Sequence, residues 1–166
     1  MIFIFSFFLF FSFFSVIGYG LAFNRLFDLK FDDLNLGKIG ILGLFFLTVI
    51  SSFTHIFLPH NYLHNIFFIS LGFIYFLYSF FIKKISKKKI NYLVIIFILL
   101  LSGLLIAKNN EDFSYYHLPN TIQFFEQKLQ FGLGNLNHGF KHVSSIFLLN
   151  SIFIFPKIKY FLINIP

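Results

Sequence analysis

Long hydrophobic runs separated by short polar segments dominate the chain. A helix needs roughly 20 apolar residues to cross a lipid bilayer. Four runs reach that length: Met1 to Phe23, Ile39 to Leu58, about Ile66 to Ile82, and Ile90 to Ala107. A fifth run, Val143 to Phe155, is too short to cross unaided, and a last apolar stretch runs from Ile158 to Pro166. The pattern predicts four full transmembrane helices followed by a short apolar helix.

The first run is expected to be a retained span rather than a cleaved signal peptide. Arg25 follows the run instead of preceding it, and no pair of small residues at suitable spacing marks a cleavage site. The predicted fold class is therefore an all-α integral membrane helical bundle. Its expected organisation is four transmembrane helices over residues 1–107, an outer loop over 108–145, and over 146–166 a short apolar helix with the start of a further span.

Composition excludes several classes of protein. Hydrophobic residues make up 58% of the chain and charged residues only 11%, whereas soluble domains carry about 25% charged residues. That excludes a soluble enzyme and a disordered chain. Although the net charge is +7, the basic residues lie between apolar runs, so no nucleic-acid partner is expected. The chain has no cysteine, which excludes a disulfide framework, a thiolate zinc site and a cysteine nucleophile.

The distribution of lysine and arginine predicts the orientation in the membrane. Lys83, Lys84 and the lysines at 87–89 form the connection KKISKKK between the third and fourth runs. Since cytoplasmic loops are enriched in basic residues, this connection is placed inside. The amino terminus and the segment from Lys108 to His142 then lie outside. All six histidines fall on or near that outer side.

The outer loop begins with acidic residues and tyrosines, which are not expected as filler residues of a membrane span. Glu111 and Asp112 follow the fourth span directly, and the interfacial residue type tyrosine comes next. Pro119 suits the first turn of a helix, and Asn120 with Gln123 has the spacing of a capping box. Apolar residues then recur at helical spacing at Leu118, Ile122, Phe125 and Leu129. We expect a helix from about Pro119 to Gln130 that lies flat in the outer interface.

A glycine-rich segment, FGLGNLNHGFKHVSS, follows this helix. His138, Lys141 and His142 lie in it, just before a helix predicted to begin at Ser144 or Ser145. Flexible backbone, cationic side chains and a helix amino terminus together suit an anion such as a phosphate. A set of ordinary surface turns is the alternative interpretation of the same residues.

Two groups of histidines invite a metal-site interpretation. His117, His138 and His142 with Asp112 match no known zinc spacing, so no metal site is predicted, although a divalent metal stays open as a cofactor. The second group is His55, His60 and His64, at the outer ends of the second and third runs. These three are interpreted as packing or interface residues.

The outer loop resembles part of a known group of proteins. Asp112, Tyr116 and His117 form the string D-x-x-x-Y-H, and an amphipathic helix, GLGN, a histidine–glycine pair and two serines follow. Over residues 109–155 this order is similar to uncharacterised bacterial multi-span proteins that resemble the C-type membrane glycosyltransferases. Those enzymes take a sugar from a polyprenyl-phosphate carrier at the outer face of the membrane.

The resemblance implies roles for individual residues. Asp112 would act as general base toward the acceptor or help place a divalent metal, with Glu111 as a neighbour and His117 in the same catalytic motif. The residues implied in binding substrate and phosphate are Tyr116, Asn135, His138, Lys141 and His142. It further implies a bacterial cytoplasmic membrane location with membrane lipid and the sugar donor as partners. Complete members have more spans, so we expect the chain to be an amino-terminal portion.

Two other functions remain as hypotheses from the sequence. A transporter or a flippase for lipid-linked sugars usually carries ionisable residues near the middle of the membrane, and the four runs have none apart from His55 near an outer end. A small accessory or structural membrane protein without catalysis is the other alternative.

The predicted orientation is testable with a single cysteine, because the chain has none of its own. A cysteine at Ser86 should not react with a membrane-impermeant thiol reagent in intact cells, since Ser86 lies in the cytoplasmic lysine connection. Permeabilised cells provide the positive control. Labelling in intact cells would show that the orientation is reversed.

Overall fold

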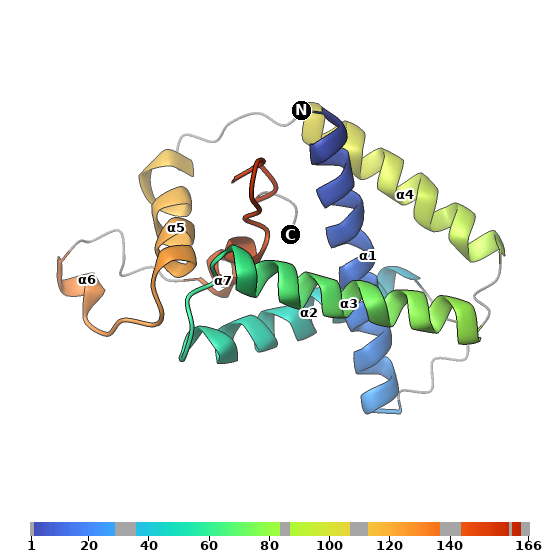
Figure 1. The fold of residues 1–166 in the computed structure, drawn as a ribbon, viewed down its shortest axis with the longest axis horizontal. Coiled ribbons are helices and arrows are strands. Elements are labelled where there is room, and N and C mark those ends of the chain that lie inside the picture. The colour runs from blue at the N-terminus through green and yellow to red at the C-terminus, as the bar shows by residue number, and fades with distance from the viewer. Residues whose placement is uncertain are drawn as a thin grey trace. The chain divides into compact units, whose positions relative to one another are not determined.

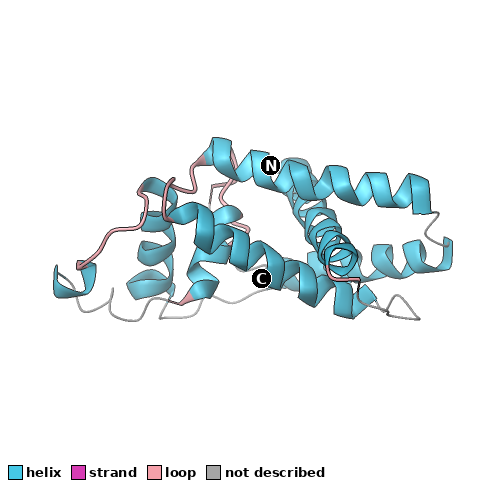
Figure 2. Ribbon diagram, turned by 90° about the horizontal axis from the view of Figure 1, so that it is seen from below, coloured by secondary structure: helices cyan, strands magenta, loops and turns pink. Residues whose placement is uncertain are grey.

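The computed structural model of the protein describes residues 2–28, 36–83, 87–106, 113–136, 144–159 and 161–163. These residues are almost entirely helical (Figures 1 and 2). The four long helices are α1 (Ile2–Leu26), α2 (Leu36–His55), α3 (Tyr62–Lys83) and α4 (Lys87–Ile106). The short ones are the π-helix η1 (Phe113–His117), α5 (Leu118–Glu126), α6 (Leu133–Leu136) and α7 (Ser145–Ile152). The described ranges contain no β-strand, so the all-α prediction is confirmed for them.

Three of the helices are long and apolar enough to cross a membrane. They are Ile2–Leu26, Leu36–His55 and Tyr62–Ile82, and they coincide with the first three predicted runs. The fourth predicted run falls on α4, which begins with three lysines. The count of four spans stays a prediction. Three such helices fit a membrane protein, as the composition indicates.

The chain forms two compact units, which are described separately. Residues 1–47 and 67–106 form the first, and residues 48–66 and 107–166 form the second. The last turns of α2 and the first turn of α3 thus belong to the same unit as the short helices η1, α5, α6 and α7. In the first unit, Phe14, Ile17, Ile39, Phe76 and Leu93 form a buried apolar cluster.

Close backbone approaches join the helices of the first unit. A Cβ atom added at any of three glycines would overlap a carbonyl of a neighbouring helix: Gly18 of α1 (against Gly72), Gly20 of α1 (against Ile39) and Gly43 of α2 (against Val16). The Tyr19 hydroxyl also donates to the carbonyl of Phe68, at 2.7 Å. Small residues at such crossings are how helices pack in lipid, where burial of apolar surface drives association only weakly.

The last apolar stretch of the sequence turns back instead of continuing as a helix. The helix α7 ends at Ile152, and the described residues after it form turns with an antiparallel bridge between Phe155 and Lys159. Pro156 explains the interruption, because proline lacks a backbone N–H and restricts the residue before it. Ile158 and Leu162 are buried within the second unit.

The glycine contacts predict that glycine-to-alanine variants differ in stability according to position. Gly18→Ala and Gly43→Ala should each lower the stability of the protein in detergent by ~1–3 kcal/mol, because the added methyl group forces two helices apart. Gly103→Ala is the matched control: nothing lies within 4 Å of its added Cβ, so it should be neutral or stabilising by up to ~1 kcal/mol. Thermal melts followed by circular dichroism measure the difference. Equal melting temperatures for all three variants would contradict the packing.

Candidate functional site

Three histidine rings meet in the second unit. His55 ends α2, His60 lies in the connection to α3, and His64 is in the first turn of α3. They are 2%, 0% and 7% exposed. The rings of His60 and His64 are stacked with centroids 4.6 Å apart, and those of His55 and His60 meet edge to face at 4.9 Å. Their interpretation as packing residues agrees with this burial.

Hydrogen bonds fix the tautomer of His60. Its Nε2 lies 3.1 Å from the carbonyl oxygen of Ser51, and its Nδ1 lies 2.6 Å from the Ser151 hydroxyl. Because a carbonyl can only accept, the neutral ring carries its hydrogen on Nε2 and its Nδ1 accepts from the Ser151 hydroxyl, whose one hydrogen is shared with the Leu148 carbonyl at 2.7 Å. His60 therefore ties the end of α2 to α7 with both ring nitrogens.

Backbone and amide groups extend this network. The Asn65 amide donates to the carbonyls of Ser151 at 2.8 Å and Ile154 at 3.0 Å. The backbone N–H of His60 donates to the Phe124 carbonyl at 3.0 Å, and that of Leu129 donates to the His55 carbonyl at 2.9 Å. The helix α5, the segment after it and α7 are thus held against the ends of α2 and α3.

The helix α5 begins differently from the prediction. Its N-cap is His117, and the expected capping box of Asn120 with Gln123 does not form. Because η1 runs directly into α5, Asn120 already lies inside the helix, where its side chain donates to the Tyr116 carbonyl at 2.7 Å. The Thr121 hydroxyl likewise donates to the His117 carbonyl at 2.8 Å.

The helix α5 is also shorter than predicted and buries another face. It ends at Glu126 rather than Gln130. Its buried residues are Asn120, Thr121 and Phe124, whereas the predicted apolar stripe of Leu118, Ile122, Phe125 and Leu129 is partly or fully accessible. The buried face contacts the histidine rings, since Phe124 lies 4.9 Å from His55 between ring centroids. Whether α5 lies in a membrane interface stays a prediction.

The structure describes three of the predicted site residues. Tyr116 and His117 are half-buried at the start of α5, where the His117 ring lies 5.0 Å from Phe147 of α7. Asn135 is exposed on α6. Tyr116 and His117 therefore lie together, whereas Asn135 lies on another helix. Glu111, Asp112, His138, Lys141 and His142 lie outside the described residues, so their predicted roles are not placed.

The predicted start of the last helix is confirmed. The side chain of Ser144 accepts a hydrogen bond from the backbone N–H of Ile146 and so caps α7. Within the described ranges, no three histidine, cysteine, aspartate or glutamate side chains gather in a way that could hold a metal ion.

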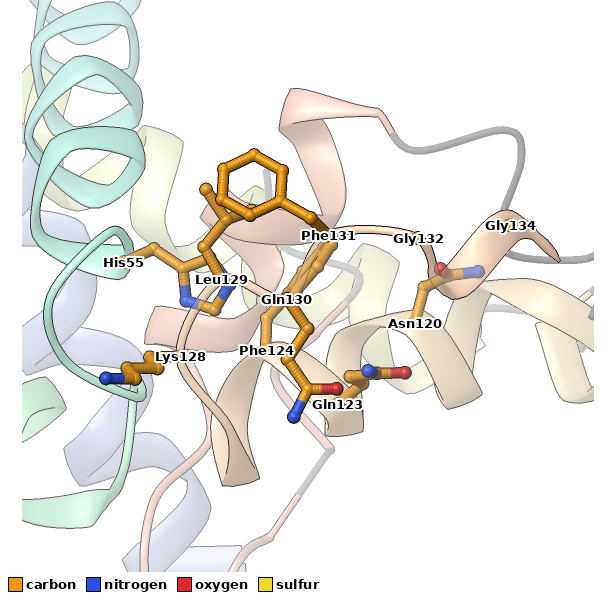
Figure 3. Close-up of a pocket in the computed structure, with 10 residues that line it drawn as sticks. All are labelled: His55, Asn120, Gln123, Phe124, Lys128, Leu129, Gln130, Phe131, Gly132 and Gly134. Atoms are coloured by element: carbon orange, nitrogen blue, oxygen red, sulfur yellow. The ribbon is translucent and has the colours of Figure 1, made fainter. Parts of the chain in front are cut away.

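A cavity of about 200 Å³ lies beside α5 in the second unit (Figure 3). Its lining combines amide, aromatic and glycine residues with one imidazole and one lysine: His55, Asn120, Gln123, Phe124, Lys128, Leu129, Gln130, Phe131, Gly132 and Gly134. In Figure 3 the His55 ring and Asn120 lie on opposite sides of this group. None of these ten residues is acidic. A wider groove of about 570 Å³ follows another face of α5 and is lined by residues that include Glu126 and Gln127.

Most of this lining is not predicted from the sequence. From the sequence, His55 is expected to be a packing or interface residue, Asn120 part of a capping box, and Gln130 the end of a helix. The available signal is the density of glutamines and phenylalanines in QFFEQKLQF. An interfacial helix has no need of so many amides.

Burial sets the charge state of His60. Desolvation, followed by the neighbouring His64 and His55, lowers the pKa of His60 to about 3 from its ordinary value of 6.5. The ring is therefore neutral at pH 7, which agrees with its hydrogen bonds. Because the unfolded chain binds the proton more readily, stability should be complete above pH 6.5 and should fall as the pH drops toward 3.

This linkage predicts acid sensitivity that depends on His60. Between pH 6 and pH 4, the protein in detergent should lose up to ~1.4 kcal/mol of stability per pH unit through this group. His60→Gln keeps one donor and one acceptor but does not titrate, so its melting temperature should fall less steeply with acid. Circular dichroism melts at several pH values make the comparison. Parallel curves for the two proteins would contradict the assignment.

Comparison with known proteins gives one match. No curated protein and no solved structure matches the chain. One family model, described as "Domain of unknown function (DUF8201)", matches residues 1–165. Since that match covers nearly all of its residues, the chain belongs to this family, DUF8201.

Proposed function

We propose that the protein is an integral membrane glycosyltransferase-like protein that uses a polyprenyl-phosphate-linked sugar at the outer face of a bacterial cytoplasmic membrane. The observation that supports this most directly is the place of the cavity. His55, which lines it, is the last residue of a helix long enough to span a membrane. A cavity at the end of such a helix lies at the level where a lipid carrier presents its head group.

The chemistry of the lining agrees with a sugar. Sugar hydroxyls both donate and accept hydrogen bonds, and the amides of Asn120, Gln123 and Gln130 do the same. The C–H faces of a sugar ring pack on aromatic side chains, and Phe124 and Phe131 provide two. Ligand pockets commonly combine such apolar surfaces with a few polar groups.

The size of the cavity restricts the ligand further. Pockets for drug-sized molecules enclose roughly 300–1,000 Å³, and this cavity encloses about 200 Å³. A single sugar ring is the appropriate size, whereas an oligosaccharide would extend out of it. One ring is also what a monosaccharide carried on a lipid phosphate would present.

The resemblance at the outer loop provides the chemical step. The carboxylate of Asp112 removes a proton from an acceptor hydroxyl as that oxygen bonds to the anomeric carbon of the sugar. The bond from the anomeric carbon to the phosphate oxygen breaks, and polyprenyl phosphate leaves with the electron pair. His138, Lys141 and His142 stabilise the leaving phosphate. Such a general base contributes roughly 10²–10⁴-fold to the rate.

An accessory membrane protein without catalysis is the second candidate. It is favoured by the roles of His60 and Asn65, whose side chains connect the end of α2 and the start of α3 to α7 and the residues just after it. In this alternative the second unit is a rigid head that supports a partner protein at the membrane surface. A partner interface would then replace the sugar as the ligand of this unit.

Replacement of Asp112 separates the two candidates. In membranes that contain the full-length protein, Asp112→Asn should abolish transfer of radiolabelled sugar from a polyprenyl-phosphate donor, because it keeps the shape of the side chain but removes the base. Insertion into the membrane should be unchanged. Lys141→Ala should instead mainly raise the apparent KM for the donor.

Glu111→Gln is the matched control, with the same loss of charge one residue away. If only Glu111→Gln loses transfer, the two acids have exchanged roles. If the double variant transfers sugar as the wild type does, the acidic pair has no catalytic function and the enzymatic proposal fails.

A further inference from the structure

The His55 imidazole, unlike those of His60 and His64, makes no hydrogen bond within the described part of the chain. Its Nδ1 atom is buried without a partner there, and the residue as a whole is 2% exposed. In contrast, both ring nitrogens of His60 and of His64 have partners. A buried polar atom without a partner costs about 1–3 kcal/mol, and in native proteins such atoms are uncommon and are explained by strain, a catalytic role, or a bound water or ion.

The orphan nitrogen belongs to a residue that lines the cavity. Among the described residues of the lining, His55 contributes the one imidazole, and the other side-chain polar groups are amides and one ammonium. None of these described residues is a carboxylate, so they offer little to a cation. They do not favour a metal ion either, because they include no second histidine and no acid. The missing partner of His55 is therefore best supplied by an uncharged hydroxyl group.

An accessible aromatic ring lies on the same side as His55. Phe131 is 92% exposed, and Figure 3 shows its ring beside Leu129, above the imidazole of His55. A large apolar side chain so exposed at a cavity provides a flat surface for the C–H face of a ring. The amides of Gln123 and Gln130 lie on the lower side of the group in the same view.

We infer that this cavity is a binding site for one uncharged sugar ring, in which the His55 imidazole hydrogen-bonds a ring hydroxyl, Phe131 stacks on the ring and Gln130 contacts a further hydroxyl. The inference rests on the proposed function for the choice of a sugar, and it adds the residues that recognise it. These residues lie on α2 and after α5, apart from the motif that carries Asp112.

Direct binding of simple glycosides tests the site without any transfer reaction. The full chain is placed in phosphatidylcholine nanodiscs, because detergents with sugar head groups would compete. Saturation-transfer NMR is recorded with the methyl glycosides of glucose, galactose, mannose and N-acetylglucosamine, with uracil as a control that contains no sugar. At least one glycoside should receive saturation from the protein, and uracil and empty nanodiscs should give none.

Exposed residues make variants that leave the fold intact. Phe131→Ala should weaken glycoside binding by roughly tenfold, which corresponds to ~1.4 kcal/mol, and Gln130→Ala should weaken it severalfold. Gln127→Ala is the matched control, since Gln127 is equally an exposed glutamine of this segment but lines the other groove. It should bind as the wild type does.

His55→Phe distinguishes a ligand-binding histidine from a structural one. It keeps an aromatic ring against Phe124 but removes the orphan nitrogen, so binding should be lost while the melting temperature stays the same or rises. A large drop in the melting temperature with unchanged binding would overturn the role of His55.

The outcomes also separate this inference from the proposed function. Asp112→Asn should still bind glycosides. If glycosides bind and the cavity variants weaken them while no sugar transfer is found, the site stands and the enzymatic proposal fails. If no glycoside binds, or if Phe131→Ala and Gln130→Ala bind as Gln127→Ala does, the cavity is not a sugar site, whatever the result for transfer.

Discussion

The second unit depends on one neutral imidazole that is bonded on both sides. His60 donates to the Ser51 carbonyl near the end of α2 and accepts from the Ser151 hydroxyl on α7, 91 residues along the chain. Loss of this ring would remove the connection between Ser51 and Ser151, although the Ser51 carbonyl would keep the Thr54 hydroxyl and the Ser151 hydroxyl would keep the Leu148 carbonyl as partners. Protonation of the ring would be costly because it would place a charge in a low-dielectric interior. The position of α7 against the end of α2 follows from this pair of bonds.

The three buried histidines have different roles in the structure, although the sequence alone does not distinguish them. His60 and His64 use both ring nitrogens within the fold. His55 bonds through its backbone carbonyl, which accepts from Leu129, and its ring meets the cavity. Groups that the fold holds in place in this way would lose little entropy if a ligand bound beside them.

Each of the two units is stabilised internally by a different kind of contact. In the first, glycines allow helix backbones to touch and aromatic rings fill the remaining space, as between Phe14 and Phe76, whose centroids are 4.7 Å apart. Such contacts are effective in lipid, where apolar surface has no water to escape. In the second unit, hydrogen bonds from histidine, serine and asparagine side chains join the helices, whereas close contacts at glycines join them in the first. Hydrogen bonds of this kind keep polar groups in fixed positions.

Hydrophobic length alone determined the long helices, since a run of about 20 apolar residues has few other stable forms. The cap at Ser144 was equally visible, because capping depends on neighbours in the chain. The predicted capping box at Asn120 does not form, because η1 continues directly into α5 and so places Asn120 inside the helix. Only the tertiary structure decided that His55 and Asn120, 65 positions apart, line one cavity. Periodicity reports which face of a helix is apolar, but which distant segment covers that face depends on the path of the whole chain.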